Sequence, residues 1–192
     1  MKTDQINAVV IGASAGGIEA LQQILPRLPK GYHLPIVIVL HIPSGQRSYL
    51  SELFLTKTDM LVKEADEKEV IKSGTIYFAP PGYHLLIERD FTFSLSTEES
   101  VHYSRPSIDV LFESAAEAFG THLLGILLTG ASPDGAAGLK RIQDRGGVAL
   151  IQNPDTALAR VMPEAARSLL LPLSEQVLSL EEIVLLLLRL KR

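Results

Sequence analysis

The alternation of short apolar runs with helical patterns is the feature that most constrains the fold of this chain. Segments 7–12, 35–41, 123–130 and 148–152 are almost continuous runs of Val, Ile, Leu and other apolar residues. Such runs indicate strands that are buried on both faces of a sheet. Helical patterns separate them, which is typical of parallel strands joined by crossover helices. We therefore expect an α/β fold: a doubly wound, mostly parallel sheet with helices on both faces.

Local signals mark the ends of several expected elements. Ser107 stands at the N-cap position of a helix over 105–120, and Gly120 ends that helix. The Arg89-Asp90 pair separates two strand-like segments and predicts a β-hairpin. The segments expected in addition are strands at 75–80, 84–88 and 91–95 and helices at 18–28, 48–57, 134–146, 162–170 and 180–190.

Length and composition exclude several classes of protein. The chain has 192 residues, so we expect a single domain over 1–192. It has no cysteine, which excludes disulfides, thiolate metal sites and a cysteine nucleophile. A net charge of −4 offers no general attraction to nucleic acid or anionic lipid. No segment reaches the roughly 20 apolar residues that span a bilayer, and the first ten residues do not form a signal peptide. We expect a cytoplasmic protein without membrane insertion.

The first apolar run ends in the glycine-rich turn GASAGG, residues 12–17, which raises the question of a phosphate site. The dinucleotide fingerprint G-x-G-x-x-G requires glycine where this chain has Ser14. The next strand ends in His41 instead of an acidic ribose ligand, and no Lys-Ser or Lys-Thr pair follows the glycines. We therefore expect no nucleotide and no other cofactor.

The same turn matches G-x-S-x-G between a strand and a helix, the pattern of a nucleophile elbow. Ser14 is then either a nucleophile or simply a helix N-cap. Paired parallel strands lie about 5 Å apart, so pairing of segments 7–12 and 35–41 would bring His41 within reach of Ser14. Asp134 follows a third strand, where it could orient His41, cap the helix over 134–146, or do both. The sequence thus predicts a Ser/His/Asp triad of Ser14, His41 and Asp134.

These motifs together resemble the catalytic domain of the CheB protein-glutamate methylesterases over residues 7–172. The resemblance implies an α/β fold and a triad at Ser14, His41 and Asp134. It also implies hydrolysis of glutamate γ-methyl esters on the cytoplasmic region of methyl-accepting chemoreceptors, and in many members deamidation of glutamine. The segments that carry it are VVIGASAGGIEAL, IVIVLHIPSG, IYFAPPGYHLLI, SRPSIDVLFESAA, GILLTGASPDGAAGL and QNPDTALARVMPEAA.

The chain departs from the family pattern at three positions near the expected site. Ala15 stands where the family has threonine, Ala131 where it has methionine, and Pro133 where it has asparagine. The family's methionine position is implicated in the oxyanion hole through its backbone N–H, and Ala131 keeps such a donor. Pro133 has no N–H and restricts the conformation of its loop.

Two further residues are candidates for lining the cleft. Arg105 either contacts an acidic receptor segment or is an ordinary exposed loop arginine. Met162 either borders the site or packs in the core. The remaining histidines have no spacing typical of metal ligands, so we expect surface or structural roles and no metal site. These histidines are His33, His84, His102 and His122.

Many CheB relatives carry a phosphorylatable receiver domain before the esterase. The first expected strand of this chain begins at residue 7, so we expect a stand-alone esterase domain, with any regulation supplied by a separate chain. The alternative is a catalytically degenerate module that binds receptors or signalling partners without turnover. The presence of Ser14, His41 and Asp134 together favours the enzyme.

Overall fold

The fold is built on a seven-stranded sheet in which every recorded strand pairing is parallel. The computed structural model describes residues 5–41, 49–170 and 176–190. The strand order is β3-β4-β2-β1-β7-β8-β9, so the chain winds outward from β1 in both directions. The strands are β1 (Ala8–Ala13), β2 (Ile36–Leu40), β3 (Leu61–Glu64), β4 (Thr75–Phe78), β7 (Leu123–Leu127), β8 (Val148–Gln152) and β9 (Val177–Leu178).

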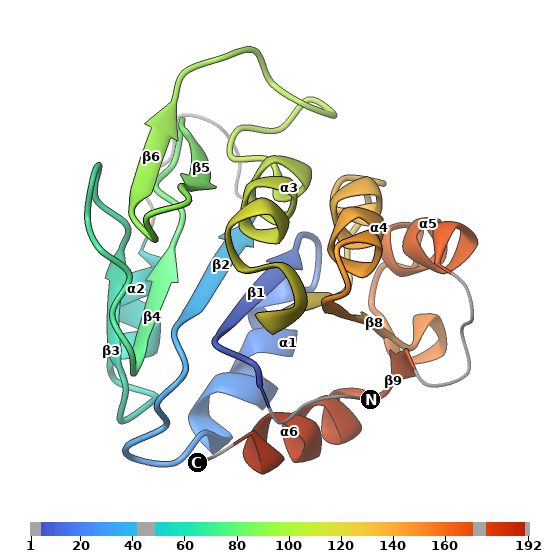
Figure 1. Cartoon of the computed structure of the whole chain (residues 1–192). Coiled ribbons are helices and arrows are strands. Elements are labelled where there is room, and N and C mark those ends of the chain that lie inside the picture. Colours follow the sequence, from blue (N-terminus) through green and yellow to red (C-terminus); the bar gives the residue numbers. More distant parts are fainter. Residues whose placement is uncertain (1–4, 42–48, 171–175, 191–192) are drawn as a thin grey trace.

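Helices cover both faces of this sheet (Figure 1). One face packs against α1 (Gly17–Ile24), α2 (Leu50–Leu55) and α6 (Leu180–Arg189). The other face packs against α3 (Ile108–Phe119), α4 (Ala136–Asp144), α5 (Val161–Leu169) and the hairpin of β5 (His84–Ile87) and β6 (Phe93–Ser96). Three short 3₁₀ turns complete the elements: Leu25–Arg27, Gly120–His122 and Pro154–Thr156.

The two hydrophobic cores explain why the central strands are apolar throughout. Along β1, Val9 and Ile11 belong to the core beneath α1 and α6, whereas Ala8 and Val10 belong to the core beneath α3. Gly12 continues the second series, and a Cβ atom there would lie 2.3 Å from Cγ2 of Ile108. Side chains along a strand alternate between the two faces of the sheet. The next position of this series is Ser14, which therefore lies on the α3 side at the end of β1.

The structure confirms the doubly wound α/β fold and the hairpin, whose β5 and β6 pair antiparallel. Ser107 caps α3 as expected, because its hydroxyl accepts a hydrogen bond from the Val110 amide. The short edge strands β3 and β9 were not predicted, and β7 ends at Leu127 rather than at residue 130. The expected helix over 48–57 begins outside the described residues at 48, and its described part is α2. Within the described ranges, no helix is long and apolar enough to cross a membrane.

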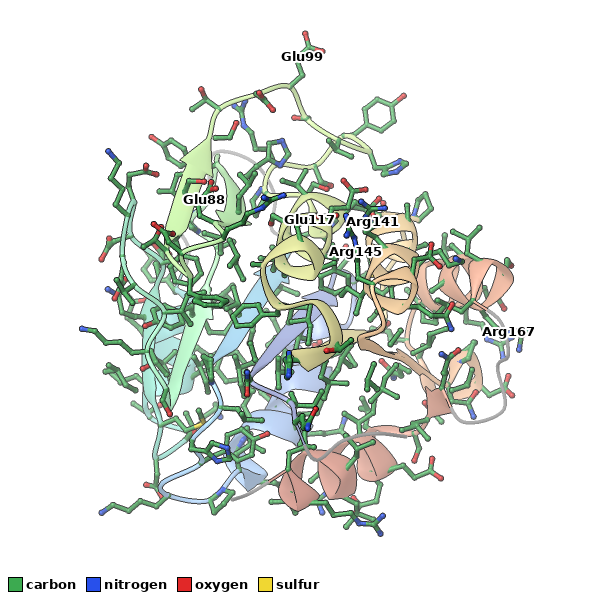
Figure 2. All side chains as sticks on the ribbon, viewed as in Figure 1. Glu88, Glu99, Glu117, Arg141, Arg145 and Arg167 are labelled. Carbon is green, nitrogen blue, oxygen red and sulfur yellow. The ribbon has the colours of Figure 1, made fainter. Side chains whose placement is uncertain are left out.

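An ion-pair group joins α3 to α4 on the outer surface (Figure 2). Glu117 of α3 lies between the guanidinium groups of Arg141 and Arg145. These side chains are partly exposed, and exposed ion pairs contribute little to stability. The buried contacts at the other end of the same two helices are therefore the more important ones.

Candidate active site

The predicted triad residues follow three neighbouring strands at the carboxyl edge of the sheet. Ligands bind in α/β sheets where the winding reverses, and here that place is the end of β1. Ala13 is paired in register with Leu40, and the His41 amide donates to the Ala13 carbonyl at 3.0 Å. Ser14 and His41 are thus the next residues of two adjacent strands.

Ser14 lies on a sharp turn between β1 and α1. Its amide donates to the Thr129 carbonyl at 3.0 Å, and its carbonyl accepts from the Gly17 amide at 2.8 Å. The N-cap residue of α1 is Gly16, with a left-handed φ of 79°, so Ser14 is not the N-cap. A Cβ atom at Gly16 would lie 2.7 Å from Cβ of Leu158, so both backbone conformation and space require glycine there. The turn leaves Ser14 partly exposed beside the start of a helix.

His41 and Asp134 form the central contact of the site. Nε2 of His41 lies 2.8 Å from Oδ2 of Asp134, with the imidazole 11% exposed and the carboxylate fully buried. Since an ionised carboxylate only accepts hydrogen bonds, Nε2 carries the proton and Nδ1 is the nitrogen available to accept one. The structure thus brings together two of the three predicted triad side chains by a direct hydrogen bond.

The first turn of α3 holds the Asp134 carboxylate. Oδ2 also accepts from the Ile108 amide at 2.7 Å, and Oδ1 accepts from the Ser107 hydroxyl at 2.8 Å and the Asp109 amide at 3.1 Å. Burial raises the pKa of Asp134, but the hydrogen bonds from His41, the two amides and the Ser107 hydroxyl outweigh it and bring the pKa below its ordinary value. Asp134 is therefore ionised at neutral pH despite its burial.

The two helices exchange their carboxylate caps. Asp134, just before α4, accepts from the first amides of α3, and Asp109 of α3 accepts from the Gly138 amide of α4 at 2.7 Å. Gly138 permits this close approach, because a Cβ atom there would lie 2.6 Å from Cβ of Phe112. Each carboxylate lies at a helix N-terminus, where the macrodipole favours negative charge. The position of Asp134 is therefore set by how α3 packs against α4.

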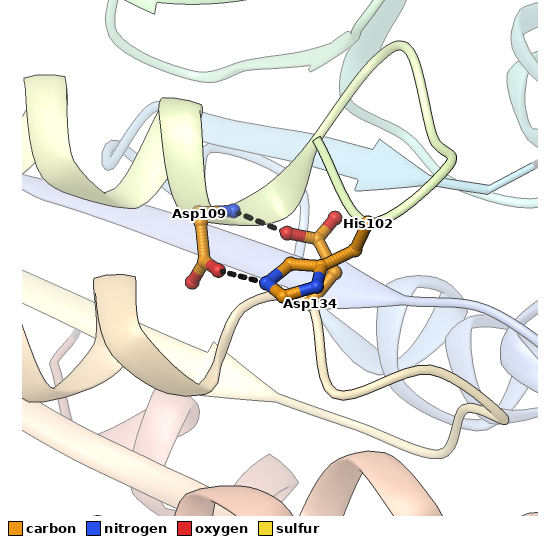
Figure 3. Close-up of side chains that lie close together, drawn as sticks. All are labelled: His102, Asp109 and Asp134. Atoms are coloured by element: carbon orange, nitrogen blue, oxygen red, sulfur yellow. Dashed lines mark hydrogen bonds and ion pairs between the residues drawn. The ribbon is translucent and has the colours of Figure 1, made fainter. Parts of the chain in front are cut away.

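His102 joins these two carboxylates in a cluster whose ligand atoms all lie within 4.8 Å of one another (Figure 3). Its Nε2 lies 3.5 Å from Oδ2 of Asp109. Three such groups suit a divalent cation in principle, but each oxygen of Asp134 already accepts two hydrogen bonds from protein donors. A cation bound to Asp134 would compete with these donors, so we do not assign a metal site here.

The pH dependence of stability should carry a signature of Asp109. Burial raises the pKa of Asp109 to about 6, the Gly138 amide opposes that rise, and the nearby Asp134 charge reinforces it. Between these two pKa values, Asp109 is therefore protonated in the folded state and ionised in the unfolded state, where its pKa is the ordinary 3.8. The contribution of Asp109 to the free energy of unfolding should fall as pH rises from about 4 to about 6. Urea unfolding of wild type and Asp109→Asn across this window should show a smaller decline for the variant; parallel curves would contradict the assignment.

Four further residues are candidates for lining the cleft: Arg105, Met162, Ala15 and Ala131. Arg105 donates from Nη1 to the carbonyls of Thr97 (2.7 Å) and Glu98 (2.9 Å), so it fastens the loop after β6. Its contact with a substrate stays a prediction, and so does an oxyanion role for the exposed Ala15 and Ala131.

Met162 is fully buried and supports the loop after β7. Its amide donates to the Gly130 carbonyl at 3.0 Å, and a Cβ atom at Gly130 would lie 2.5 Å from Cε of Met162. The packing role proposed from sequence is therefore seen directly, whereas a contact of Met162 with substrate stays a prediction.

Two polar residues of the site were missed from the sequence. Oγ of Ser104 lies 3.4 Å from Nδ1 of His41, whereas within the described ranges the hydrogen bonds of Ser14 are made by its backbone. The buried Thr129 hydroxyl donates to the Ala15 carbonyl and accepts from the Ala159 amide, both at 2.9 Å. Thr129 thus ties the Ser14 turn to the loop before α5. The sequence marks Thr129 only by its place shortly after β7, and Ser104 only by its place two residues before Pro106.

Comparison with known proteins identifies the family of the chain. The sequence model of the family described as CheB methylesterase matches residues 9–187. This chain belongs to that family. A protein of Leptospira interrogans named "Putative protein-glutamate methylesterase/protein-glutamine glutaminase" is 51% identical over 183 residues, which are 95% of this chain and 94% of that protein.

Two further similarities extend the comparison. A protein-glutamate methylesterase/protein-glutamine glutaminase of Archaeoglobus fulgidus is 39% identical over 82% of this chain and 46% of its own length. The crystal structure of the Thermotoga maritima CheB methylesterase catalytic domain superposes with a TM-score of 0.89 at 30% identity and covers 96% of this chain and 98% of that one. The chain therefore has the fold of a CheB catalytic domain over almost all of its length.

Proposed function

We propose that this chain is a protein-glutamate methylesterase that hydrolyses glutamate γ-methyl esters on the cytoplasmic region of methyl-accepting chemoreceptors. Ser14 is the nucleophile, His41 the general base and Asp134 the carboxylate that orients His41. The observation that carries the proposal is the 2.8 Å contact between His41 and a buried, ionised Asp134, placed beside a G-x-S-x-G turn. Membership of the CheB methylesterase family supplies the substrate class.

The reaction proceeds through an acyl-enzyme. Because Nε2 of His41 is held by Asp134, Nδ1 takes the proton as Ser14 Oγ attacks the ester carbonyl. For this transfer, the Ser14 hydroxyl takes the place of the Ser104 hydroxyl, whose Oγ lies 3.4 Å from Nδ1. His41 returns the proton to the leaving methoxide, which departs as methanol. A water molecule, deprotonated by His41, then attacks the acyl-enzyme, releasing the glutamate carboxylate and restoring the Ser14 hydroxyl.

The negative charge of the tetrahedral intermediate needs hydrogen-bond donors next to Ser14. The amide groups of Ala15 and Ala131 are the candidates, and the N-terminus of α1 adds a favourable dipole. A backbone donor does not depend on side-chain identity, so Ala131 serves where the family has methionine. One such donor is typically worth about 10²–10³ in kcat.

Deamidation of receptor glutamine would use the same machinery. The acyl-enzyme is identical, and ammonia leaves in place of methanol after protonation by His41. The Leptospira relative carries this second activity in its name. We propose it for this chain as a slower reaction, because an amide is the less reactive acyl group. Control by a separate regulatory chain stays a prediction.

The competing proposal is a receptor-binding module without turnover. It accounts for the capping of α3 by Asp134, but it gives no reason for an imidazole to be hydrogen-bonded to that carboxylate beside a G-x-S-x-G turn. Mass spectrometry of a chemoreceptor fragment methylated by its methyltransferase, before and after incubation with this protein, tests the choice. We expect the mass of each methylated glutamate peptide to fall to that of the free acid, with release of an equal amount of methanol. A protein that binds the fragment and leaves every methyl group in place would be the binding module.

A further inference from the structure

A buried histidine that takes no part in the proposed chemistry lies behind the site. His84 is the first residue of β5 and is only 2% exposed. Its Nδ1 accepts from the Ser107 amide at 3.1 Å, and its Nε2 lies 3.0 Å from the Glu99 carbonyl. An amide only donates and a carbonyl only accepts, so the neutral Nε2–H tautomer alone satisfies both contacts.

Ser107 transmits this contact to the candidate carboxylate. Its amide is held by His84, while its hydroxyl donates to Oδ1 of Asp134 at 2.8 Å. The next two residues of the chain, Ile108 and Asp109, supply the other amides that bind Asp134. Among the residues that the structure describes, three of the four donors to Asp134 therefore come from a short segment whose first residue is fixed by His84.

The second contact of His84 connects it to the loop that contacts Nδ1 of His41. Glu99 lies in the loop after β6 (Figure 2), and the same loop carries Ser104, whose hydroxyl is 3.4 Å from Nδ1 of His41. These hydrogen bonds thus form a circuit through His84, Ser107, Asp134, His41 and the loop of Ser104. His84 is where the two arms of this circuit meet.

We propose that His84 is a positioning residue for the esterase reaction, acting through Ser107 on the orientation of Asp134. This inference rests on the proposed function. Burial of an imidazole that is only 2% exposed is costly unless its nitrogens are hydrogen-bonded, and both bonds go to backbone groups that lead to the site. A purely space-filling role would be met by an apolar residue, whereas these contacts fix the start of α3 relative to the hairpin.

Two amide variants separate the arms of the circuit. In His84→Asn the side-chain oxygen takes the place of Nδ1, keeps the acceptor for Ser107 and loses the Glu99 contact. In His84→Gln the side-chain nitrogen reaches the place of Nε2, keeps the Glu99 contact and loses the acceptor for Ser107. Each variant loses one buried hydrogen bond, so a merely structural residue would give both the same loss of stability and of activity.

We expect His84→Gln to lower kcat for methanol release by up to about 100-fold with little change in KM, because a small misplacement of a catalytic group has effects of that size. We expect His84→Asn to stay close to wild type. Ser107→Ala removes the hydroxyl but keeps the amide contact with His84. It should lower kcat in the same way, and its effect combined with His84→Gln should be less than the product of the two. Equal kcat values for the two His84 variants, or a drop in both that follows their thermal stability, would overturn the proposal.

A second readout is independent of turnover. In ¹⁵N-histidine NMR spectra, the Nε2–H signal of His41 reports its hydrogen bond to Asp134. It should shift in His84→Gln and in Ser107→Ala but not in His84→Asn; an identical signal in wild type and His84→Gln refutes the positioning role. If wild type releases no methanol at all, the proposed function fails, while this spectrum still decides whether His84 controls the His41–Asp134 pair.

Discussion

Replacing Ser14 by alanine should lower kcat for methanol release by about 10⁶-fold, the loss found when the serine of a serine protease triad is removed. The variant loses the atom that forms the acyl-enzyme, while His41 and Asp134 keep their hydrogen bond. Ser14 makes its hydrogen bonds through its backbone within the described ranges, so the fold should be unaffected. Receptor binding should persist, and circular dichroism should show an unchanged melting temperature.

The matched control is Ser104→Ala, because Ser104 is the hydroxyl that the structure places within 3.4 Å of His41 Nδ1. It lies well inside the loop between β6 and α3. Ser14 directly follows β1, on a turn with a glycine in the left-handed conformation. We expect a modest loss for Ser104→Ala. If Ser104→Ala abolished methanol release and Ser14→Ala did not, the nucleophile would be Ser104.

The sequence was sufficient for the features that depend on local pattern. Continuous apolar runs predicted the central parallel strands because those strands are buried on both faces. The carboxyl ends of such strands meet at one edge of the sheet, which predicts that His41 and Asp134 lie near each other. The edge strand β3 was missed because Leu61–Glu64 is partly exposed and mixes apolar with charged residues. The strand β9 has only two residues and no pattern to detect.

The hydrogen bonds that hold the triad residues in place could not be predicted from the sequence, for a different physical reason. Ser107 was predicted as a helix cap, which it is, but its bond to Asp134 depends on how closely α3 approaches the loop before α4. That approach depends on a glycine at 138 and on packing between elements far apart in the chain. His84 lacks any ligand or catalytic spacing, and its partners are backbone atoms, which sequence patterns do not identify. Contacts of this kind become visible only when the helices are placed in space.

The second large effect is expected for Asp134→Asn. An asparagine keeps the shape of the side chain but removes its charge and converts one acceptor oxygen into a donor. If the amide nitrogen takes the place of Oδ2, it faces two other donors, the Ile108 amide and His41 Nε2–H. If it takes the place of Oδ1, it faces the Ser107 hydroxyl and the Asp109 amide, which also donate. His41 loses the carboxylate that holds its tautomer and stabilises its protonated form, so kcat should fall by about 10⁴-fold, as it does when the triad aspartate of a serine protease becomes asparagine.

Stability should fall with activity in this variant, because a hydrogen bond to a charged group contributes about 1.5–3 kcal/mol. The pKa of Asp134 is lowered by folding, so the stabilisation is fully present above the ordinary value of 3.8 and is lost as pH falls through the lower value of the folded state. The difference in unfolding free energy between wild type and Asp134→Asn should therefore be constant near neutral pH and shrink in acid. Asp144→Asn is the control, since Asp144 forms an exposed ion pair with Lys140 on α4 and its replacement should change neither kcat nor stability appreciably. A difference between wild type and Asp134→Asn that grows as pH falls would show that the buried carboxylate is not held ionised by the start of α3.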